Sequence, residues 1–290
     1  TGTTFGCRAI PPPPKGSGFS RKYLMNVFSL SDFHKEDRPN ITSIMSLVQI
    51  PLGARLVLVV GDMMPWYSGM GQENPYYKLV VLPLIELGKT VISICGNHEY
   101  YWSDMEDVDR EMHELSQETD GWYHLQAGMS FEIDGWAFIG ATLWTGLAGL
   151  GNPARSKQAI GPLNDRKCIR IAGKGMTHKD VIRLYEQHKS GLSNAVGAAR
   201  ARGLKTAILS HHAPSPVFIP RSYMHEKTSL SFASTAIDDI KPDVWFFGHI
   251  HKPYNMHHKG VWCICNPIGY ADETVSFSES MIDLESIHKE

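Results

Sequence analysis

Five short polar stretches, each directly after an apolar run, carry the residues of this chain that could do chemistry. They are Ser31–His34 (SDFH), Gly61–Asp62, Gly96–Glu99 (GNHE), Ser210–His212 (SHH) and Gly248–His251 (GHIH). Together they supply carboxylate, amide and imidazole groups, which bind divalent metal ions. The set is large enough for two ions, and a pair of ions can assist the hydrolysis of a phosphate ester.

Two of these stretches place metal-binding side chains two residues apart. Asp32 and His34 would share one face of an extended strand end, and His249 and His251 repeat this spacing. Asp32 and His34 could together chelate one ion, although such a pair alone is common by chance. His211 closes another strand, and a single histidine there is more often an ordinary hydrogen-bonded residue. Chance becomes an improbable explanation only when the stretches are taken jointly and in order.

The other two stretches follow buried apolar runs. Asp62 comes after Leu56–Val60, where a carboxylate would be costly to desolvate unless it is paired or bound to a metal. The alternative for Asp62 is a helix cap or turn residue. Asn97, His98 and Glu99 follow a glycine after a second such run, and a hydrogen-bonded turn is the alternative there.

Strands and helices in alternation must position these residues. Short apolar runs bounded by turn residues predict strands covered on both faces. The runs are Val27–Leu30, Leu56–Val60, Val91–Cys95, Ala137–Ala141, Thr206–Leu209 and Val244–Phe247. Ser103 with Glu106 predicts a capped helix to about Gln117, and Thr177 predicts a second, capped helix that continues to Arg202 and stops at Gly203. This pattern indicates an α/β layered fold, in which ligands bind beyond the strand ends.

Composition and charge bound the class of protein. The chain has 290 residues, 42% of them hydrophobic and 20% charged, with a net charge of -2. This gives no broad electropositive field for binding nucleic acid, although a local basic groove is left open. Five cysteines without a disulfide-like spacing favour a reducing compartment, and Cys263 and Cys265 are interpreted as small buried residues rather than a metal pair. With no apolar run of about 20 residues, we expect a cytoplasmic protein that does not enter the membrane.

The start of the chain differs from the rest. Pro11 to Pro14 stand in a row and are followed by Lys15-Gly16-Ser17-Gly18, which is typical of a linker. We expect residues 1–22 to form a flexible leader and residues 23–290 a single domain. Met25 opens the first strand-like run, which gives the hypothesis that the natural chain starts there.

In order and spacing, the five stretches resemble those of the calcineurin-like metallophosphoesterase family, and the resemblance spans about Met25 to Tyr270. It implies a four-layer α/β/β/α sandwich with two mixed sheets and two metal ions at the sheet edges. It assigns Asp62 as the bridging ligand and His98 as the general acid that protonates the leaving oxygen. The first ion would be bound by Asp32, His34 and His251, and the second by Asn97, His211 and His249.

The chain departs from the family at two places. Many relatives carry an Asp three positions after the Gly-Asp carboxylate, where it orients the catalytic histidine, but this chain has Pro65. Glu99, Asp104 or a more distant carboxylate would then have to orient His98, or its acid role is weaker. The arginines with which protein phosphatases of the family hold a phosphate monoester are also missing beside these stretches, where Met63 and Met64 stand instead.

A narrower resemblance points to a bacterial and phage subgroup of small metallophosphoesterases. It rests on Ile139–Trp144, Leu163–Asp165 and Asn266–Tyr270. The aromatic residues near the predicted metal edge could stack a nucleobase or simply pack the fold. A supporting or substrate-contacting role is expected for five further residues: Glu99, Tyr100, Asn164, Asp165 and His212.

These inferences predict a phosphoesterase with two divalent ions, with Mn²⁺ first and Fe, Zn²⁺ or Co²⁺ as alternatives. The missing arginines favour a phosphodiester substrate, such as a nucleotide or a related ester. A phosphomonoesterase and a non-catalytic, metal-containing interaction module are the alternatives. The sequence does not indicate an oligomeric state.

Overall fold

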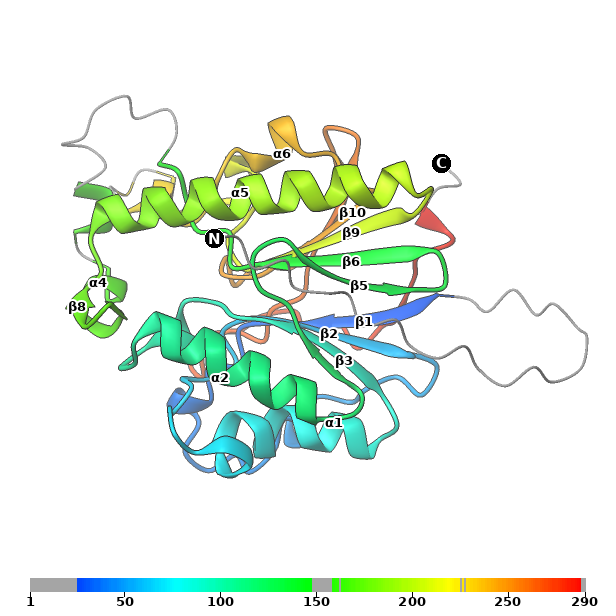
Figure 1. Cartoon of the computed structure of the whole chain (residues 1–290), viewed down its shortest axis with the longest axis horizontal. Coiled ribbons are helices and arrows are strands. Elements are labelled where there is room, and N and C mark those ends of the chain that lie inside the picture. Colours follow the sequence, from blue (N-terminus) through cyan, green and yellow to red (C-terminus); the bar gives the residue numbers. More distant parts are fainter. Residues whose placement is uncertain (1–24, 148–157, 162, 225, 227, 288–290) are drawn as a thin grey trace, which may run out of the picture.

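Two mixed β-sheets pack face to face, with helices on both outer sides (Figure 1). The computed structural model describes residues 25–147, 158–161, 163–224, 226 and 228–287. The predicted leader, residues 1–22, lies outside them, so its flexibility and the proposed domain boundary stay predictions. Among the described residues, no helix combines the length and apolar character needed to cross a membrane.

The first sheet contains three of the predicted strands side by side. Its order is β13 (Ile282–Asp283), β1 (Asn26–Leu30), β2 (Leu56–Val60), β3 (Thr90–Ile94) and β4 (Trp122–His124). The strands β1 to β4 are parallel to one another, and β13 is antiparallel to β1. The carboxyl ends of β1, β2 and β3 therefore meet at one edge, where three of the polar stretches begin.

The second sheet contains the other three predicted strands. Its order is β11 (Tyr254–His258), β12 (Val261–Cys265), β10 (Val244–Phe247), β9 (Lys205–Ser210), β6 (Trp136–Ala141) and β5 (Met129–Ile133). The four central strands are parallel, and β5 and β11 are antiparallel additions at the edges. The remaining two polar stretches follow β9 and β10. The parallel bridge between Ser31 and Pro267 joins the end of β1 to the end of β12.

Successive side chains along a strand point to opposite faces of the sheet, which divides the core into layers. Leu56, Leu58 and Val60 of β2 pack between the sheets against residues such as Phe138 and Phe246 of the second sheet. Val57 and Val59 point to the opposite face and join the core under the helices. All of these side chains are buried, which explains why the strands are apolar runs without polar alternation.

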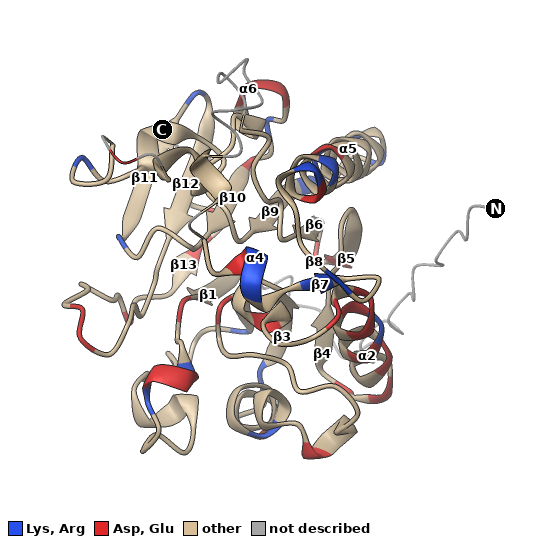
Figure 2. Ribbon diagram, turned by 90° about the vertical axis from the view of Figure 1, so that its left-hand side faces the viewer, with Lys and Arg blue, Asp and Glu red and all other residues tan. Residues whose placement is uncertain are grey.

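The helices cover the two outer faces. The short α1 (Leu82–Glu86) and α2 (Met105–Glu118) lie on the first sheet, whereas the long α5 (His178–Ala201) and α6 (Ala236–Asp239) lie on the second (Figure 1). This arrangement confirms the predicted α/β/β/α sandwich. The small hairpin of β7 (Arg170–Ile171) and β8 (Lys174–Gly175) accompanies α4 (Asp165–Cys168) near the shared strand ends (Figure 2).

The two helix starts had different outcomes. Thr177 caps α5 as predicted, since its side chain accepts a hydrogen bond from the Asp180 backbone N–H and Asp180 reciprocates. Gly203, with φ of 77°, follows the end of that helix. The prediction for α2 was wrong by one residue, because Asp104 is the N-cap and Ser103 donates its hydroxyl to the carbonyl of Trp66 instead.

The described cysteines are free thiols. Cys95, Cys263 and Cys265 are buried in the core, and Cys168 is half-buried. Cys263 and Cys265 therefore behave as the small buried residues that the sequence predicted, and Cys7 lies outside the described residues.

Candidate metal centre

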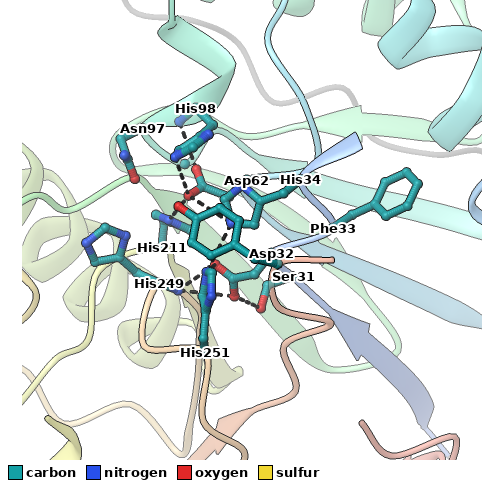
Figure 3. Close-up of polar contacts among 12 residues, drawn as sticks. Ser31, Asp32, Phe33, His34, Asp62, Asn97, His98, His211, His249 and His251 are labelled. Carbon is teal, nitrogen blue, oxygen red and sulfur yellow. Dashed lines mark hydrogen bonds and ion pairs between the residues drawn. The ribbon is translucent and has the colours of Figure 1, made fainter. Parts of the chain in front are cut away.

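The predicted ligands converge at the common edge of the two sheets, with their side chains directed toward one another (Figure 3). They divide into two groups whose potential ligand atoms lie within 4.8 Å of one another. Asp32, His34 and His251 form the first group, and Asp62, His211 and His249 form the second. This division is the one that the family resemblance implies for two ions.

Asp62 lies between the two groups. Its Oδ2 atom is 3.0 Å from His211 Nε2 on one side and 3.9 Å from His34 Nε2 on the other. Its Oδ1 atom accepts a hydrogen bond of 2.8 Å from the backbone N–H of His98. A carboxylate so placed can bridge two cations.

The first group shows an unusually close approach of two imidazoles. The Nε2 atoms of His34 and His251 are 3.0 Å apart, and Asp32 Oδ1 is 3.5 Å from His251 Nε2. Two imidazole lone pairs and a carboxylate directed at one point are the arrangement that a bound cation requires. Asp32 is also held in place, because Oδ1 accepts the His249 backbone N–H at 2.9 Å.

Beside the second group, the buried Asn97 Oδ1 atom has no hydrogen-bond partner. An orphaned buried polar atom is costly, so its presence favours a ligand at this point. The amide nitrogen of Asn97 donates to Asp165 Oδ1 at 3.0 Å, which directs Oδ1 the other way. The side-chain oxygen of Asn97 is therefore available to a cation, and the residues fit two divalent ions, each with two oxygen and two nitrogen donors.

Hydrogen bonds to the second ring nitrogen orient three of the histidines. His211 Nδ1 donates to the carbonyl of Val60 at 2.9 Å, and His251 Nδ1 donates to Glu273 Oε2 at 2.6 Å. Both contacts leave Nε2 facing the centre, as is common for metal-binding histidines. His34 Nδ1 lies 3.4 Å from Glu36 in the same sense.

Backbone conformation brings these side chains together. Five predicted ligands have left-handed φ angles, between 46° and 67°. These are Asp32, His34, Asp62, His249 and His251. Such angles are unfavourable for residues other than glycine and concentrate at functional sites. The turns must therefore be held by the surrounding structure.

Two glycines and one glutamate hold the turns. A Cβ atom on Gly61 would lie 2.5 Å from the Gly96 nitrogen, and one on Gly96 would lie 2.6 Å from the Asp62 nitrogen, so neither position has room for a side chain. The buried Glu99 carboxylate accepts the backbone N–H groups of Asp62, Met63 and Gly96 at 2.6 to 2.9 Å. Glu99 therefore supports the turn that carries Asp62 and does not orient His98.

Glu36 is the carboxylate that orients His98. Its Oε1 atom accepts a hydrogen bond of 2.6 Å from His98 Nδ1, which leaves Nε2 directed toward the centre, 3.9 Å from Asp62 Oδ2. Of the alternatives that the sequence left open, the more distant carboxylate is the one found, because Glu99 binds the turn of Asp62 and Asp104 caps α2. Glu36 is a more distant carboxylate in sequence, 62 positions before His98, although it is only two positions after His34.

The charges around His98 favour its protonated form. Burial would lower the pKa of His98, but the carboxylates of Asp62 and Glu36 outweigh it and raise the pKa to about 9. Burial would likewise raise the pKa of Glu36, yet hydrogen bonds with His34 and His98 lower it to about 2. A proton on His98 Nε2 is what a general acid at this position needs.

The other residues singled out from the sequence lie at different distances from the centre. Asn164 and Asp165 line its cavity, and Asp165 also accepts the Tyr101 hydroxyl at 2.8 Å. His212 is buried with its ring 4.3 Å from that of His249. Tyr100 does not line this cavity, because its hydroxyl donates to Asp109.

Three residues at the centre, Tyr101, Tyr270 and Glu273, were not among the predicted site residues. Tyr101 stacks on His98 at 4.1 Å between ring centroids, and Tyr270 lies 4.2 Å from His34. Glu273 follows His251 by 22 positions in an irregular loop. Their positions depend on tertiary structure, although Tyr101 and Tyr270 belonged to stretches noted in the sequence.

Comparison with known proteins gives the chain its relatives. An uncharacterized protein of Acanthamoeba polyphaga mimivirus is 21% identical over 213 residues, which are 68% of this chain and 74% of that protein. A phosphopantetheinyl hydrolase from Mycobacterium tuberculosis has a similar structure, with a TM-score of 0.55, 15% identity and coverage of 86% and 90% of the two chains. A dimetal phosphatase from Danio rerio is similar with a TM-score of 0.50, 12% identity and coverage of 87% and 89%.

These structural likenesses concern the fold, and the sequence match is more specific. Residues 25–253 match the sequence model described as calcineurin-like phosphoesterase. This region contains all five polar stretches, and hence both groups of converging side chains. The chain therefore belongs to the calcineurin-like phosphoesterase family.

Proposed function

We propose that this protein is a phosphodiesterase that uses two divalent metal ions. The observation that carries the proposal is the placement of Asp62 between two groups of histidine and carboxylate ligands, with His98 directed at the same point. When bound, two divalent ions neutralise phosphate oxygens and lower the pKa of water at the centre. The chain's own residues supply the rest of the reaction.

His98 is proposed to protonate the leaving oxygen. Glu36 accepts the hydrogen bond from Nδ1 and so keeps the second proton of the imidazolium on Nε2, which faces the centre. Asp62 accepts the backbone N–H of His98 and so holds this residue beside the proposed bridging carboxylate. Proton transfer from a positioned side chain contributes about 10²- to 10⁴-fold to rate.

The walls of the cavity favour a diester over a monoester. Among its described lining residues none is Lys or Arg, whereas Asp165 and Glu273 present carboxylates. A monoester carries one negative charge more than a diester near neutral pH, so it would be repelled more strongly by these carboxylates. A phosphomonoesterase with the same ions is the second candidate, supported by the same donor set.

The donor set also bears on the ion. Each group combines two oxygen and two imidazole donors, a mixture that suits Mn²⁺, Fe, Co²⁺ or Zn²⁺. We propose Mn²⁺ first, and a nucleotide or a related ester as substrate. The pyrimidine or purine ring of such a substrate would meet the aromatic residues of the cavity.

The proposal is tested with two nitrophenyl esters. We expect the Mn²⁺-loaded protein to hydrolyse bis(4-nitrophenyl) phosphate at least 10-fold faster, in kcat/KM, than 4-nitrophenyl phosphate. Faster turnover of the monoester would identify a phosphomonoesterase. If neither ester is turned over, or if His98→Ala and Asp62→Asn hydrolyse them as fast as the wild type, a non-catalytic module is the better description.

A further inference from the structure

The cavity over the metal centre has a wall that no ligand or acid role explains. The cavity has a volume of about 270 Å³ and contains His98, Asp62 and His249 at its base. This is near the lower limit of small-molecule sites, which are roughly 300 Å³ and larger. An ester group of one or two rings fits such a volume, and a long polymer would have to extend outside.

One side of the cavity is a row of two aromatic rings that leads outward from a predicted ligand. The Phe232 ring lies 5.3 Å from the His249 ring, and the Tyr223 ring lies 6.5 Å from Phe232. Tyr223 is 43% exposed, so the row reaches the surface of the molecule. Pro220 and Ile250 line the same cavity. The Phe232 and Tyr223 rings are inclined by 60° to each other, so a planar, uncharged group can stack on one ring while it contacts the edge of the other.

Two carboxyl groups also line the cavity, and both already accept hydrogen bonds from the protein. Glu273 accepts hydrogen bonds from His251 and from the Tyr270 backbone, and Asp165 accepts them from Asn97 and Tyr101. A substrate group that carried further phosphates would lie close to these carboxylates and be repelled. The aromatic wall therefore favours an uncharged ring, and the two carboxyl groups disfavour a second phosphate that does not contact the ions.

We infer that the substrate is a phosphodiester with one uncharged, ring-containing ester group, which stacks on Phe232 and Tyr223. The inference rests on the proposed phosphodiesterase function and specifies its substrate class. Phe232 and Tyr223 are its specificity-determining residues. The phosphate lies at the base of the cavity, and the leaving oxygen faces His98.

Hydrolysis of three esters with the same leaving group tests this. All three are phosphodiesters with 4-nitrophenol as the leaving group. The second ester group is phenyl in the first, methyl in the second and a short alkyl chain that carries another phosphate in the third. We expect kcat/KM for the phenyl ester to exceed that for the methyl ester by at least 10-fold, because only the phenyl group can stack on an aromatic ring of the wall. We expect the ester with the additional phosphate to be the poorest substrate.

Two variants test whether Tyr223 and Phe232 cause the preference for the phenyl ester. Tyr223→Ala and Phe232→Leu should each reduce the ratio of kcat/KM for the phenyl ester to that for the methyl ester at least 3-fold. Phe232→Leu keeps an apolar side chain, so the loop retains its packing. Met224→Ala is the matched control, because Met224 is exposed and adjacent to Tyr223 but does not line the cavity. Its ratio should equal that of the wild type.

Binding without turnover separates this inference from the proposed function. Calorimetry on the Mn²⁺-loaded protein should show that diphenyl phosphate binds at least 10-fold more tightly than dimethyl phosphate. If the esters are hydrolysed but phenyl and methyl are equivalent in both assays, the substrate class is wrong and the phosphodiesterase function stands. If diphenyl phosphate binds selectively and no ester is hydrolysed, the phosphodiesterase function fails and the inferred substrate class fails with it. A preference that survives in both Tyr223→Ala and Phe232→Leu would also overturn the inference.

Discussion

Glu36 shows how one residue compensates for a departure from the family. Pro65 stands where many relatives have the carboxylate that orients the catalytic histidine, and Glu36 makes the contact with His98 Nδ1 from another turn. Its second oxygen, Oε2, is buried without a hydrogen-bond partner. The glutamate therefore has one principal function in this structure, which is to fix the ring of His98 and, more weakly, that of His34.

We predict that Glu36→Gln impairs proton donation more than it impairs metal binding. The amide is a weaker acceptor for His98 Nδ1–H and removes the charge that favours imidazolium. Diesters with a poor leaving group, such as an alkoxide, should lose about 10- to 100-fold in kcat, whereas 4-nitrophenyl esters, whose leaving group needs little protonation, should lose much less. Steady-state kinetics on the two classes, with metal content measured by elemental analysis, checks this.

Asp37→Asn is the control for Glu36→Gln, because Asp37 is the exposed neighbour in the same short turn. It should leave both ester classes unaffected. An equal loss for good and poor leaving groups in Glu36→Gln, or a parallel loss of bound metal, would contradict the assignment of Glu36 to His98.

At this scale the sequence predicted the residues that belong to strand ends and missed those that depend on tertiary contacts. Asp32, Asp62 and His211 follow apolar runs directly, so their convergence could be expected from the parallel strands. The function of Glu36 could not be expected from the sequence, because its distance to His98 depends on the turn after β1 and not on the number of residues between them. The same holds for Glu273 and Phe232, which reach the cavity from irregular segments.

At the scale of single elements, α2 places a buried carboxyl group beside a second cavity. Asp109 of this helix accepts the hydroxyl of Tyr100 at 2.7 Å beside a cavity of about 210 Å³. Burial raises the pKa of Asp109 to about 7, although the hydrogen bond from Tyr100 opposes this shift. The folded protein therefore retains a proton that the unfolded chain loses near pH 4.

The raised pKa of Asp109 predicts that Asp109→Asn increases the free energy of unfolding by an amount that depends on pH. Since the folded pKa is above the unfolded one, the wild type loses stability as the pH rises from about 4 to about 7, and asparagine cannot ionise. The free energy of unfolding of the metal-free variant should exceed that of the wild type by an amount that grows by roughly 1–3 kcal/mol between pH 5 and pH 8. Urea unfolding at both pH values measures it.

Asp107→Asn on the exposed face of the same helix serves as the reference. Asp107 pairs with Arg110 at the surface, so its replacement should change stability little at either pH. A gain in Asp109→Asn that is identical at pH 5 and pH 8 would mean that ionisation of Asp109 is not its cause.

Local sequence signals were sufficient for some elements and insufficient for others. The capping box at Thr177 was correctly read because both of its partners lie within one turn. At α2, Ser103 and Asp104 are both good caps, and the choice depends on Trp66, which takes the serine hydroxyl. Short edge strands such as β13 have too few residues for a periodic signal.

At the scale of the whole molecule, the metal centre joins the two sheets. Asp32, Asp62 and Asn97 follow strands of the first sheet, and His211 and His249 follow strands of the second. The layered architecture was predictable because the family resemblance supplied what periodicity lacks, namely which strands share a sheet. The order of strands within each sheet was not contained in the local patterns.

Because bound ions would connect both sheets, we predict that they stabilise the entire fold. At a free Mn²⁺ concentration 100 times Kd, one site adds about 2.7 kcal/mol to the free energy of unfolding, which should appear as a rise of several degrees in Tm. Asp62→Asn should lose most of this rise, while Asp134→Asn at the exposed end of a hairpin should keep it. Thermal scans with and without Mn²⁺ test this, and an undiminished rise in Asp62→Asn would show that the ion binds elsewhere.

The backbone N–H groups that hold Asp32 and Asp62 have one further consequence. His249 and His98 donate them from neighbouring turns, and Glu99 secures the turn of Asp62 in addition. These hydrogen bonds therefore fix the two carboxylates in the metal-free protein, in the positions needed to bind a cation. Exchange of one ion for another should then move the chain very little, so we expect cellular supply and donor chemistry, rather than a rearrangement of the protein, to decide which ion is bound.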